Sequence, residues 1–441
     1  MGNNKATIYK YSKYNHSGTL SDGSVLVYNL FSSSVAILSN EEFDFLNREY
    51  IDGSYNLELC QLAASQNIII PIEEDELNKL LALKYANNYN NTKAGFQILP
   101  TTACNARCFY CYEQGFETST MDKETADATV KFILEYCEHM QEVNITWFGG
   151  EPFVCENTME YISSKLIPIL AASGKRFSAS VITNGSLINN INIEKIVQLY
   201  KIREIQITLD GRGKEYLRRK MYVDSEVTYE QILDAITLLT KNKVKVTVRL
   251  NVDRNNIDEC LGAIDDLYYS NADKDYLWPY AAPLYSDKDN DFCLPEEELN
   301  AVYEKIFIKL IDRGFISTVN GLPMNFMNAA CCAKMLNNFV ISPDGSISKC
   351  EHMLNCKDEV IGSVHTGICF NEAMARWSSP HIPDACKTCS DLPNCQAGCE
   401  TAERLGFGYG RCAYVHFINN AIVKAADYLL NKGGVRNEDI T

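Results

Sequence analysis

The chain lacks any run of 18 apolar residues, the length that a membrane-spanning helix requires. It also lacks a charged N-terminal stretch followed by an apolar one, so we expect a cytoplasmic protein rather than a secreted or anchored one. Cations are scarce as well, because 41 lysines and arginines stand against 57 acidic residues, a net charge of −16. This balance gives no electrostatic footprint for nucleic acid or an anionic membrane and favours a peptide or small molecule as partner.

Cysteine, in contrast, is abundant, with 18 in 441 residues. Without an export signal, these residues are expected to be metal ligands and reduced thiols rather than disulfides. The chain is long enough for two or three domains with ample core.

Residues 1–86 read as a small separate unit. Apolar runs at 25–30, 35–38 and 68–71 predict short strands, Ser39-x-x-Glu42 is a capping box, and 57–64 is helical in pattern. Leu77, Leu80, Leu81 and Tyr85 mark one face of a further helix. This combination resembles a winged-helix peptide-binding module, and the polar stretch 87–92 that follows reads as a linker.

From about Gly95 onward, strand-like runs alternate with helical ones. The predicted strands are 96–101, 143–148, 177–182, 203–209, 244–252 and 276–282. Such alternation indicates a parallel α/β sheet, and six βα units fit either an incomplete barrel or an open doubly wound sheet. In both, the site lies at the carboxyl ends of the strands.

Side-chain alternation predicts an enclosed polar bore. In the strand 244–252, alternate residues are apolar, which leaves Thr247, Arg249 and Asn251 on the opposite face. After a helical stretch at 296–312, periodicity fades and Gly, Pro and Cys concentrate through Tyr414. We expect that region to fold around metal rather than around a large apolar core.

A cysteine triplet stands directly after the first of these strands. Cys104, Cys108 and Cys111 can hold three irons of a 4Fe–4S cube and leave the fourth iron open for a ligand that is not protein. A zinc site is the alternative, but zinc favours four protein ligands or sites with histidine, and no histidine lies nearby in the sequence.

A second set of cysteines follows the predicted sheet. Cys331 and Cys332 are adjacent, and twelve residues separate Cys332 from Gly345, which begins Gly345-x4-Cys350. The remaining ones form the run Cys386-x2-Cys389-x5-Cys395-x3-Cys399, followed by Cys412. Chance does not supply this combination.

The triplet with Tyr110 before its last cysteine, Gly149-Gly150-Glu151-Pro152 and Thr183-Asn184-Gly185 resemble radical S-adenosylmethionine (SAM) enzymes over roughly residues 95–290. The later cysteines resemble the SPASM domain of that family. The resemblance implies a partial (β/α)6 TIM-type barrel at 95–315, preceded by a winged-helix-like recognition domain at 1–86. A cysteine-rich iron–sulfur SPASM domain at 320–415 and a C-terminal helix and tail at 416–441 would follow.

The resemblance also implies that the amino and carboxylate groups of SAM chelate the open iron, and that reduction then releases a 5′-deoxyadenosyl radical. Gly149, Gly150 and Glu151 would approach the SAM amino group. Tyr110 would read adenine, and the ribose and carboxylate would meet polar residues of the bore, namely Asn184, Thr208, Asp210 and Arg249. The family often places a histidine and then an arginine after this strand, whereas this chain has Tyr216, Arg218, Arg219 and Lys220. We select Arg219 as a candidate, but which basic residue meets the carboxylate stays open, and no catalytic acid or base is assigned.

By the same resemblance, an outer auxiliary cluster is expected on Cys386, Cys389, Cys395 and Cys412. Cys331 or Cys332, with Cys350 and Cys399, would hold an inner cluster, for a total of three 4Fe–4S clusters. The fourth ligand of the inner cluster could be the neighbouring cysteine, a more distant residue or nothing. An open iron would bind a substrate thiolate, whereas a closed cluster would only pass on an electron. Structural zinc is the alternative for 386–412.

About a hundred residues precede the triplet, which favours a peptide maturase of the thioether-forming ranthipeptide or sactipeptide kind. Its substrate would be a ribosomally synthesised precursor (RiPP) whose leader adds an edge strand to the N-terminal module. An external donor such as flavodoxin or ferredoxin would supply electrons. The alternatives are a carbon–carbon crosslinking enzyme, an enzyme of the anaerobic sulfatase-maturating type and a metal-stabilised peptide-binding adaptor without catalysis.

Overall fold

A computed structural model describes residues 7–285, 292–323, 331–379, 381–406 and 408–433. The chain forms two compact units. The first comprises residues 1–86, 294–330 and 381–441, and the second comprises 87–293 and 331–380. Among the described residues, no helix has both the length and the apolar character needed to cross a membrane.

The N-terminal part of the first unit is built from short antiparallel strands and helices. β1 (Ile8–Tyr11) lies between β5 (Ile51–Asp52) and β6 (Ile69–Pro71), while β3 (Val25–Asn29) lies between β2 (Asn15–Thr19) and β4 (Val35–Leu38). The helices are α1 (Asn40–Leu46), α2 (Leu57–Ser65) and α3 (Glu76–Asn88). The predicted capping box is confirmed, because the Ser39 side chain accepts from the Glu42 amide and the Glu42 carboxylate accepts from the Ser39 amide.

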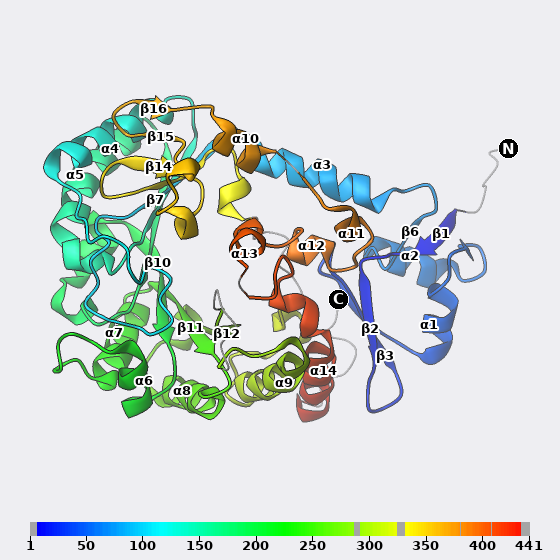
Figure 1. The fold of residues 1–441 in the computed structure, drawn as a ribbon. Coiled ribbons are helices and arrows are strands. Elements are labelled where there is room, and N and C mark those ends of the chain that lie inside the picture. The colour runs from blue at the N-terminus through cyan, green and yellow to red at the C-terminus, as the bar shows by residue number, and fades with distance from the viewer. Residues whose placement is uncertain (1–6, 286–291, 324–330, 380, 407, 434–441) are drawn as a thin grey trace. The chain divides into compact units, whose positions relative to one another are not determined.

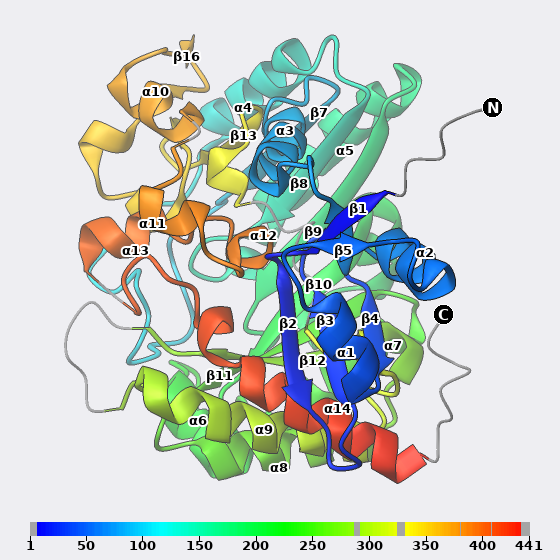
Figure 2. The ribbon, with the colours of Figure 1, turned by 90° about the vertical axis from the view of Figure 1, so that its right-hand side faces the viewer.

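Two later helices complete the packing of this unit. α9 (Glu296–Asp312), whose predicted bounds are confirmed, packs against α14 (Asn419–Gly433), and α14 also packs against β2. Figure 2 shows α14 in red beside the blue strand β2. Gly18 permits this approach, since a Cβ there would lie 2.6 Å from a methyl carbon of Val423. The unit also contains the short helices α11 (Asp384–Lys387), α12 (Leu392–Cys395) and α13 (Glu400–Leu405).

The second unit is built on a large sheet whose parallel part follows the chain. The strands are β7 (Lys93–Ile98), β8 (Glu142–Trp147), β9 (Arg176–Thr183), β10 (Ile202–Leu209), β11 (Lys245–Val252) and β12 (Leu277–Pro283), and each pairs in parallel with the next. All six predicted strands are confirmed to within three residues at either end. This is the α/β fold of a partial barrel.

Helices cover the outer face of that sheet (Figure 1). They are α4 (Lys123–Tyr136), α5 (Glu156–Ala172), α6 (Gly213–Lys220), α7 (Tyr229–Lys241) and α8 (Ile257–Tyr269). The predicted alternation in β11 is confirmed, because Val246, Val248 and Leu250 are fully buried while Thr247 and Arg249 are only half-buried. The apolar face of each strand packs under the helices, and the polar face is left for a site.

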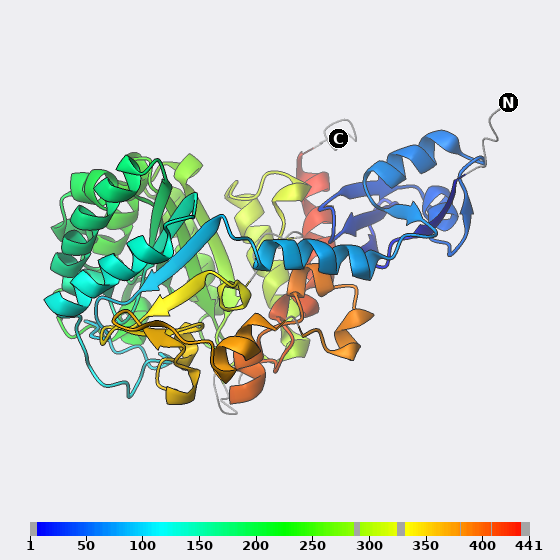
Figure 3. The ribbon, with the colours of Figure 1, turned by 90° about the horizontal axis from the view of Figure 1, so that it is seen from above.

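The sheet continues beyond β7 into the cysteine-rich region. β13 (Asn338–Ile341) pairs in parallel with β7, and β14 (Ser346–Ser348), β15 (Gly362–Ser363) and β16 (Gly367–Ile368) follow as antiparallel strands. β7 and β13 appear side by side in light blue and yellow in Figure 3. Phe339 of β13 is buried against Phe96 of β7, so the expectation that this region avoids the apolar core is wrong for residues 338–341. Helix α10 (Glu372–Ser378) follows these strands.

Candidate functional site

The cysteine triplet lies in the loop that leaves the carboxyl end of β7, where the fold places a site. The thiols of Cys104, Cys108 and Cys111 lie close enough to interact electrostatically. Burial raises the pKa of both Cys104 and Cys111 to about 11, and the neighbouring thiols add to the rise. Such thiols ionise when a metal cation supplies the compensating charge, so the donor set fits an iron–sulfur cluster.

Two glycines allow the loop after β8 to press against the cysteine loop. A Cβ on Gly150 would lie 2.4 Å from the carbonyl oxygen of Ala103, and one on Gly149 would lie 2.3 Å from that of Thr101. Gly149 also has φ +112°, a conformation that favours glycine. The Gly150 amide donates to Thr101 and the Glu151 amide to Ala103, so the two loops form one hydrogen-bonded body.

Glu151 is completely buried and bridges the loops that follow β8 and β9. Its carboxylate accepts from the Thr183 hydroxyl at 2.8 and 2.9 Å, from the Asn184 amide at 2.8 Å and from the Phe153 amide at 3.2 Å. Burial nevertheless raises the pKa of Glu151 to about 7. Asn184 in turn donates from its side chain to Asn105 inside the cysteine loop, so both predicted residues contact the site framework.

A buried polar cluster closes the other side of the triplet. The Tyr110 hydroxyl donates to Asp210, and the Lys220 ammonium lies 2.9 Å from Asp210 Oδ2 and 3.0 Å from the Tyr110 oxygen. Burial alone would lower the pKa of Lys220, but Asp210, Tyr110, Cys108 and Tyr216 together outweigh it and raise the pKa, which keeps the ammonium charged. Asp210 Oδ1 is buried and has no partner among the described residues. A free acceptor beside the cysteine loop fits a ligand that carries hydroxyl or amino donors.

The structure gives different surroundings to the three basic residues among which the sequence could not choose. Arg219 forms a buried ion pair with Asp253, and Arg218 is exposed and bound to Glu215. Lys220 alone of the three contacts Tyr110, and its carbonyl accepts from the Cys108 thiol at 3.7 Å. Sequence reasoning named Lys220 among the basic residues but selected Arg219, since only the helical rotation of α6 distinguishes the two. On β11, Arg249 donates to the side chain of Asn251. On the neighbouring strand β10, Thr208 is half-buried.

The first group of later cysteines gathers within the second unit. Cys331 and Cys332 interact through their side chains, and Cys332 also interacts electrostatically with Cys350. The hydrogen bond between the neighbouring thiols lowers the pKa of Cys331 to about 6 and raises that of Cys332. Cys399, the other predicted ligand, belongs to the first unit, where it caps α13 by accepting from the Ala402 amide.

The second group gathers within the first unit. Cys389 interacts electrostatically with Cys386 and Cys395, and Cys412 does the same. Beside them, buried Asp391 lies between two imidazoles, with His16 Nε2 3.1 Å from one carboxylate oxygen and His416 Nδ1 2.5 Å from the other. The ligand atoms of Cys389, Asp391 and His416 all lie within 4.8 Å of one another. Sequence reasoning predicted Cys389 as a ligand but missed Asp391 and its two histidines, because His16 and His416 come from segments far from Asp391 in the chain.

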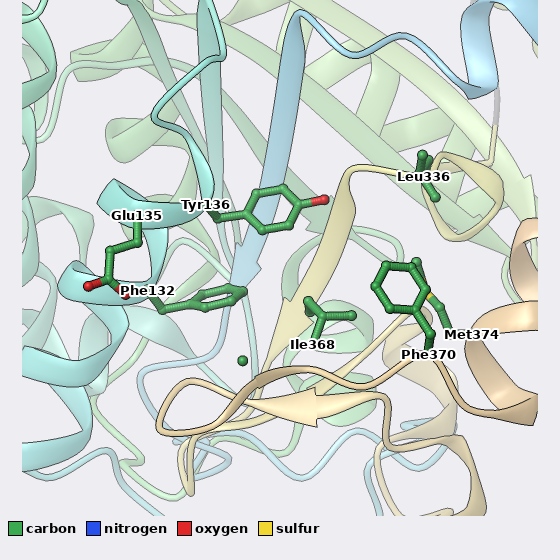
Figure 4. A pocket seen from close by; sticks show the side chains of 8 residues that line it. Phe132, Glu135, Tyr136, Leu336, Ile368, Phe370 and Met374 are labelled. Atoms are coloured by element: carbon green, nitrogen blue, oxygen red, sulfur yellow. The ribbon is translucent and has the colours of Figure 1, made fainter.

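A pocket of about 320 Å³ opens elsewhere in the second unit (Figure 4). It lies between the last turn of α4 and the segment from β16 to α10, and it is lined by Phe132, Glu135, Tyr136, Leu336, Gly367, Ile368, Phe370 and Met374. Because α4 ends where β8 begins, this pocket is at the amino end of the strands, away from the cysteine loop. It contains no thiol and belongs to neither cysteine group.

A parallel partial barrel with a three-thiol loop after its first strand fits the resemblance to radical SAM enzymes that the sequence motifs carry. Comparison with known proteins agrees, because residues 98–267 match the radical SAM superfamily. The chain therefore contains a radical SAM domain over these residues, and it is an enzyme whose cofactors are SAM and 4Fe–4S clusters.

Curated relatives include the serine-type anaerobic sulfatase-maturating enzyme of Klebsiella aerogenes, 25% identical over 319 residues, which are 67% of this chain and 77% of the relative. The cysteine-type enzyme of Clostridium novyi is 22% identical over 344 residues, 70% of this chain and 87% of the relative.

Solved structures share the fold. One is native anSMEcpe with bound AdoMet and a Cp18Cys peptide, with a TM-score of 0.58 and 17% identity, covering 77% of this chain and 99% of that one. Another is Streptococcus suis SuiB bound to precursor peptide SuiA, with a TM-score of 0.51 and 14% identity, covering 94% and 99%. The family, fold and cofactors expected from the resemblance are therefore confirmed, whereas the individual ligands stay predictions.

Proposed function

We propose that this protein is a peptide maturase that joins a cysteine sulfur to a carbon of the same ribosomally made precursor, forming a thioether. The observation that carries the proposal is the presence, in one radical SAM chain, of an N-terminal module of short strands and two further cysteine groups. The titles of the solved relatives name bound peptides, which supports a peptide substrate.

A free strand edge in the N-terminal module supports leader capture. β4 is the outer strand of its sheet, and the hydrogen bond from the Asn29 amide to the Ser34 carbonyl fixes which residues face β3. Alternation from that pair directs the backbone groups of Val35 and Ile37 away from β3. They have no partner among the described residues, so an extended leader can pair there as an added strand.

Different residues of the protein would hold the cluster and position SAM. Cys104, Cys108 and Cys111 would hold the SAM-binding cluster, Glu151 would receive the SAM amino group, and Lys220 would balance negative charge beside it. The bound cofactor supplies hydrogen-atom abstraction from the peptide. The abstracted hydrogen ends on 5′-deoxyadenosine, the thiol gives up its proton, the carbon–sulfur bond forms, and the surplus electron leaves through an auxiliary cluster.

The test is anaerobic turnover of reconstituted protein with SAM, a strong reductant and a cysteine-rich precursor peptide encoded near its gene. Mass spectrometry should show loss of a pair of hydrogen atoms and fragments that map the bond to one cysteine. Replacement of that acceptor cysteine by serine should abolish the crosslink, and a Cys104, Cys108 and Cys111 triple-Ala variant should make no 5′-deoxyadenosine. A crosslink that survives the serine replacement would instead establish carbon–carbon bond formation.

The sulfatase-maturating relatives, one serine-type and one cysteine-type, support a second candidate, modification of a serine or cysteine of a sulfatase. A synthetic sulfatase-motif peptide separates the two. Aldehyde formation on that peptide, with no change in the leader-bearing precursor, would favour this second function.

A further inference from the structure

Lys349 is a buried lysine immediately before Cys350. It follows the last residue of β14, and its side chain is almost completely removed from solvent, with a residue exposure of 2%. The ammonium lies 4.9 Å from the centre of the Phe339 ring. A lysine is rarely buried unless its charge has partners, so this position calls for an explanation.

Backbone carbonyl oxygens surround the ammonium. Nζ donates to Asn338 at 2.6 Å, to Leu336 at 3.2 Å and to Met335. An ammonium has three donors, and all three are therefore used by one short segment of the chain. These bonds tie the segment between Cys332 and β13 to the end of β14, although the two are separated along the chain by the whole turn between the strands.

Burial lowers the pKa of Lys349 to about 7, and the charges of Cys332 and Cys331 act against this lowering. The three carbonyl acceptors need all three donors of the ammonium form. The carbonyls provide only partial negative charge, so an anionic group nearby is needed to balance a full positive charge away from water. Ionised cysteines on either side, at 331–332 and at 350, would supply it.

We propose that Lys349 is the positioning residue and fixed counter-charge of the inner auxiliary cluster. It holds the Cys331–Cys332 segment against the segment that follows β14 and carries Cys350, and its positive charge favours the reduced form of the cluster held there. This inference rests on the proposed assignment of Cys331, Cys332 and Cys350 as cluster ligands.

The other cysteine groups show a related arrangement. Lys220 interacts with Cys108 in the cysteine loop after β7, and Arg411 interacts with Cys386 in the outer group. Each group thus has a nearby cation in a chain whose net charge is −16. Lys349 differs in that its donors are used entirely by backbone carbonyls, so no acidic side chain neutralises it in the hydrogen bonds described.

The test compares three variants in anaerobically reconstituted full-length protein. Lys349→Gln removes the charge but keeps amide donors, Lys349→Arg keeps the charge, and Lys357→Met changes an exposed lysine a few residues away as a matched control. Iron content and an EPR-monitored redox titration are measured in the Cys104, Cys108 and Cys111 triple-Ala background. Only the auxiliary clusters then contribute to the iron content and to the EPR signal.

We expect Lys349→Gln either to lose about four of the roughly eight auxiliary irons or to keep them with one midpoint potential shifted to a more negative value. Lys349→Arg should retain the iron, and Lys357→Met should match the unaltered background. Full iron and unchanged potentials in Lys349→Gln would overturn the inference. If the background itself holds no inner cluster, the cluster assignment fails first, which distinguishes the two failures. None of these readouts requires a peptide substrate.

Discussion

The rings of Tyr112 and His352 pack against each other with their centres 4.1 Å apart. Tyr112 directly follows Cys111 of the cysteine loop, and His352 comes two residues after Cys350. This contact joins the two cysteine-bearing segments of the second unit by side chains, in addition to the strand pairing beneath them. Burial lowers the pKa of His352, which favours the neutral ring that stacks well on an aromatic neighbour.

We therefore expect His352→Ala to uncouple SAM cleavage from peptide modification. Loss of an aromatic contact of about 1 kcal/mol should reduce crosslinked peptide by roughly fivefold, because the segment carrying Cys350 loses a support against the SAM loop. Formation of 5′-deoxyadenosine without peptide should change by less than about twofold, since the triplet is untouched. The ratio of the two products measures the effect, and His139→Ala, at an exposed position, is the control. An unchanged ratio would show that the contact is dispensable.

Gly150→Ala should disrupt the SAM cluster. The added methyl group would meet backbone atoms of Thr102 and Ala103 at 2.4–2.6 Å, and backbone cannot turn aside as a flexible side chain can. We expect loss of about four irons of about twelve and at least a hundredfold slower 5′-deoxyadenosine formation. Gly321→Ala, where the same methyl group meets only ordinary contacts at 3.6 Å, should leave both unchanged. Normal iron content in Gly150→Ala would contradict the close approach of the loops.

SAM affinity should depend on the ionisation of Glu151, whose pKa burial raises to about 7. Below that pH the carboxyl is protonated and cannot pair with an ammonium, whereas above it the carboxylate can. Binding should therefore tighten as pH rises from 6 to 8 and then level off, by less than tenfold per unit because bound SAM itself favours ionisation. Equilibrium dialysis of SAM measures this. Glu151→Gln should bind weakly at every pH, while Glu138→Gln, at an exposed carboxylate, should follow the unaltered protein. A flat profile in the unaltered protein would exclude the predicted role.

Neighbouring cations on α6 should differ strongly in their effect on stability. Lys220 is 3% exposed and Asp210 is fully buried, so Lys220→Met leaves an uncompensated buried charge and should cost about 3–5 kcal/mol. Arg218 pairs with Glu215 at an exposed position, and Arg218→Met should cost less than about 1 kcal/mol. Thermal unfolding of the metal-free variants compares them. Adding Asp210→Asn to Lys220→Met should recover part of the loss, and failure to do so would show that the pair is not the cause.

Asp391 should couple the N-terminal module to the outer cysteine group within the first unit. Replacement of its carboxylate by Ala removes the partner of both His16 and His416. We expect faster hydrogen exchange in β2, where His16 lies, and lower iron occupancy of the outer group. Asp384→Ala removes an exposed carboxylate paired with Lys387 and serves as the control. Unchanged exchange in β2 would mean that the module is held by other contacts.

Much of the barrel could be predicted because its signals are local. Alternating Val and Leu in 244–252 predicts a strand, and the capping box at Ser39 predicts a helix start, since each depends on neighbouring residues. β13 to β16 escaped prediction because they are only two to four residues long and gain their order from pairing with β7. Short segments of this kind carry no period of their own.

The same difference between local and tertiary signals explains which site residues could be predicted. Motif spacing identified the triplet and Gly149-Gly150-Glu151, but not what the glycines contact or that Lys220 rather than Arg219 lies against Tyr110. Lys349 and Asp391 gave no signal at all, because a charged residue in a sequence is normally read as exposed. Only tertiary structure shows that each is buried beside cysteines.

The pairing of β13 with β7 has a consequence for electron transfer. Asn338 lies opposite Gly95 and Ile341 opposite Ile98, β7 leads to Cys104, and β13 turns back through β14 to Cys350. Because a strand advances about 3.3 Å per residue, a two-residue slip in this register would displace one cysteine segment relative to the other by roughly 7 Å. A one-residue slip would turn every side chain of β13 to the opposite face. If the two segments hold clusters as proposed, the tunnelling distance between those clusters would therefore be set mainly by which backbone amides pair.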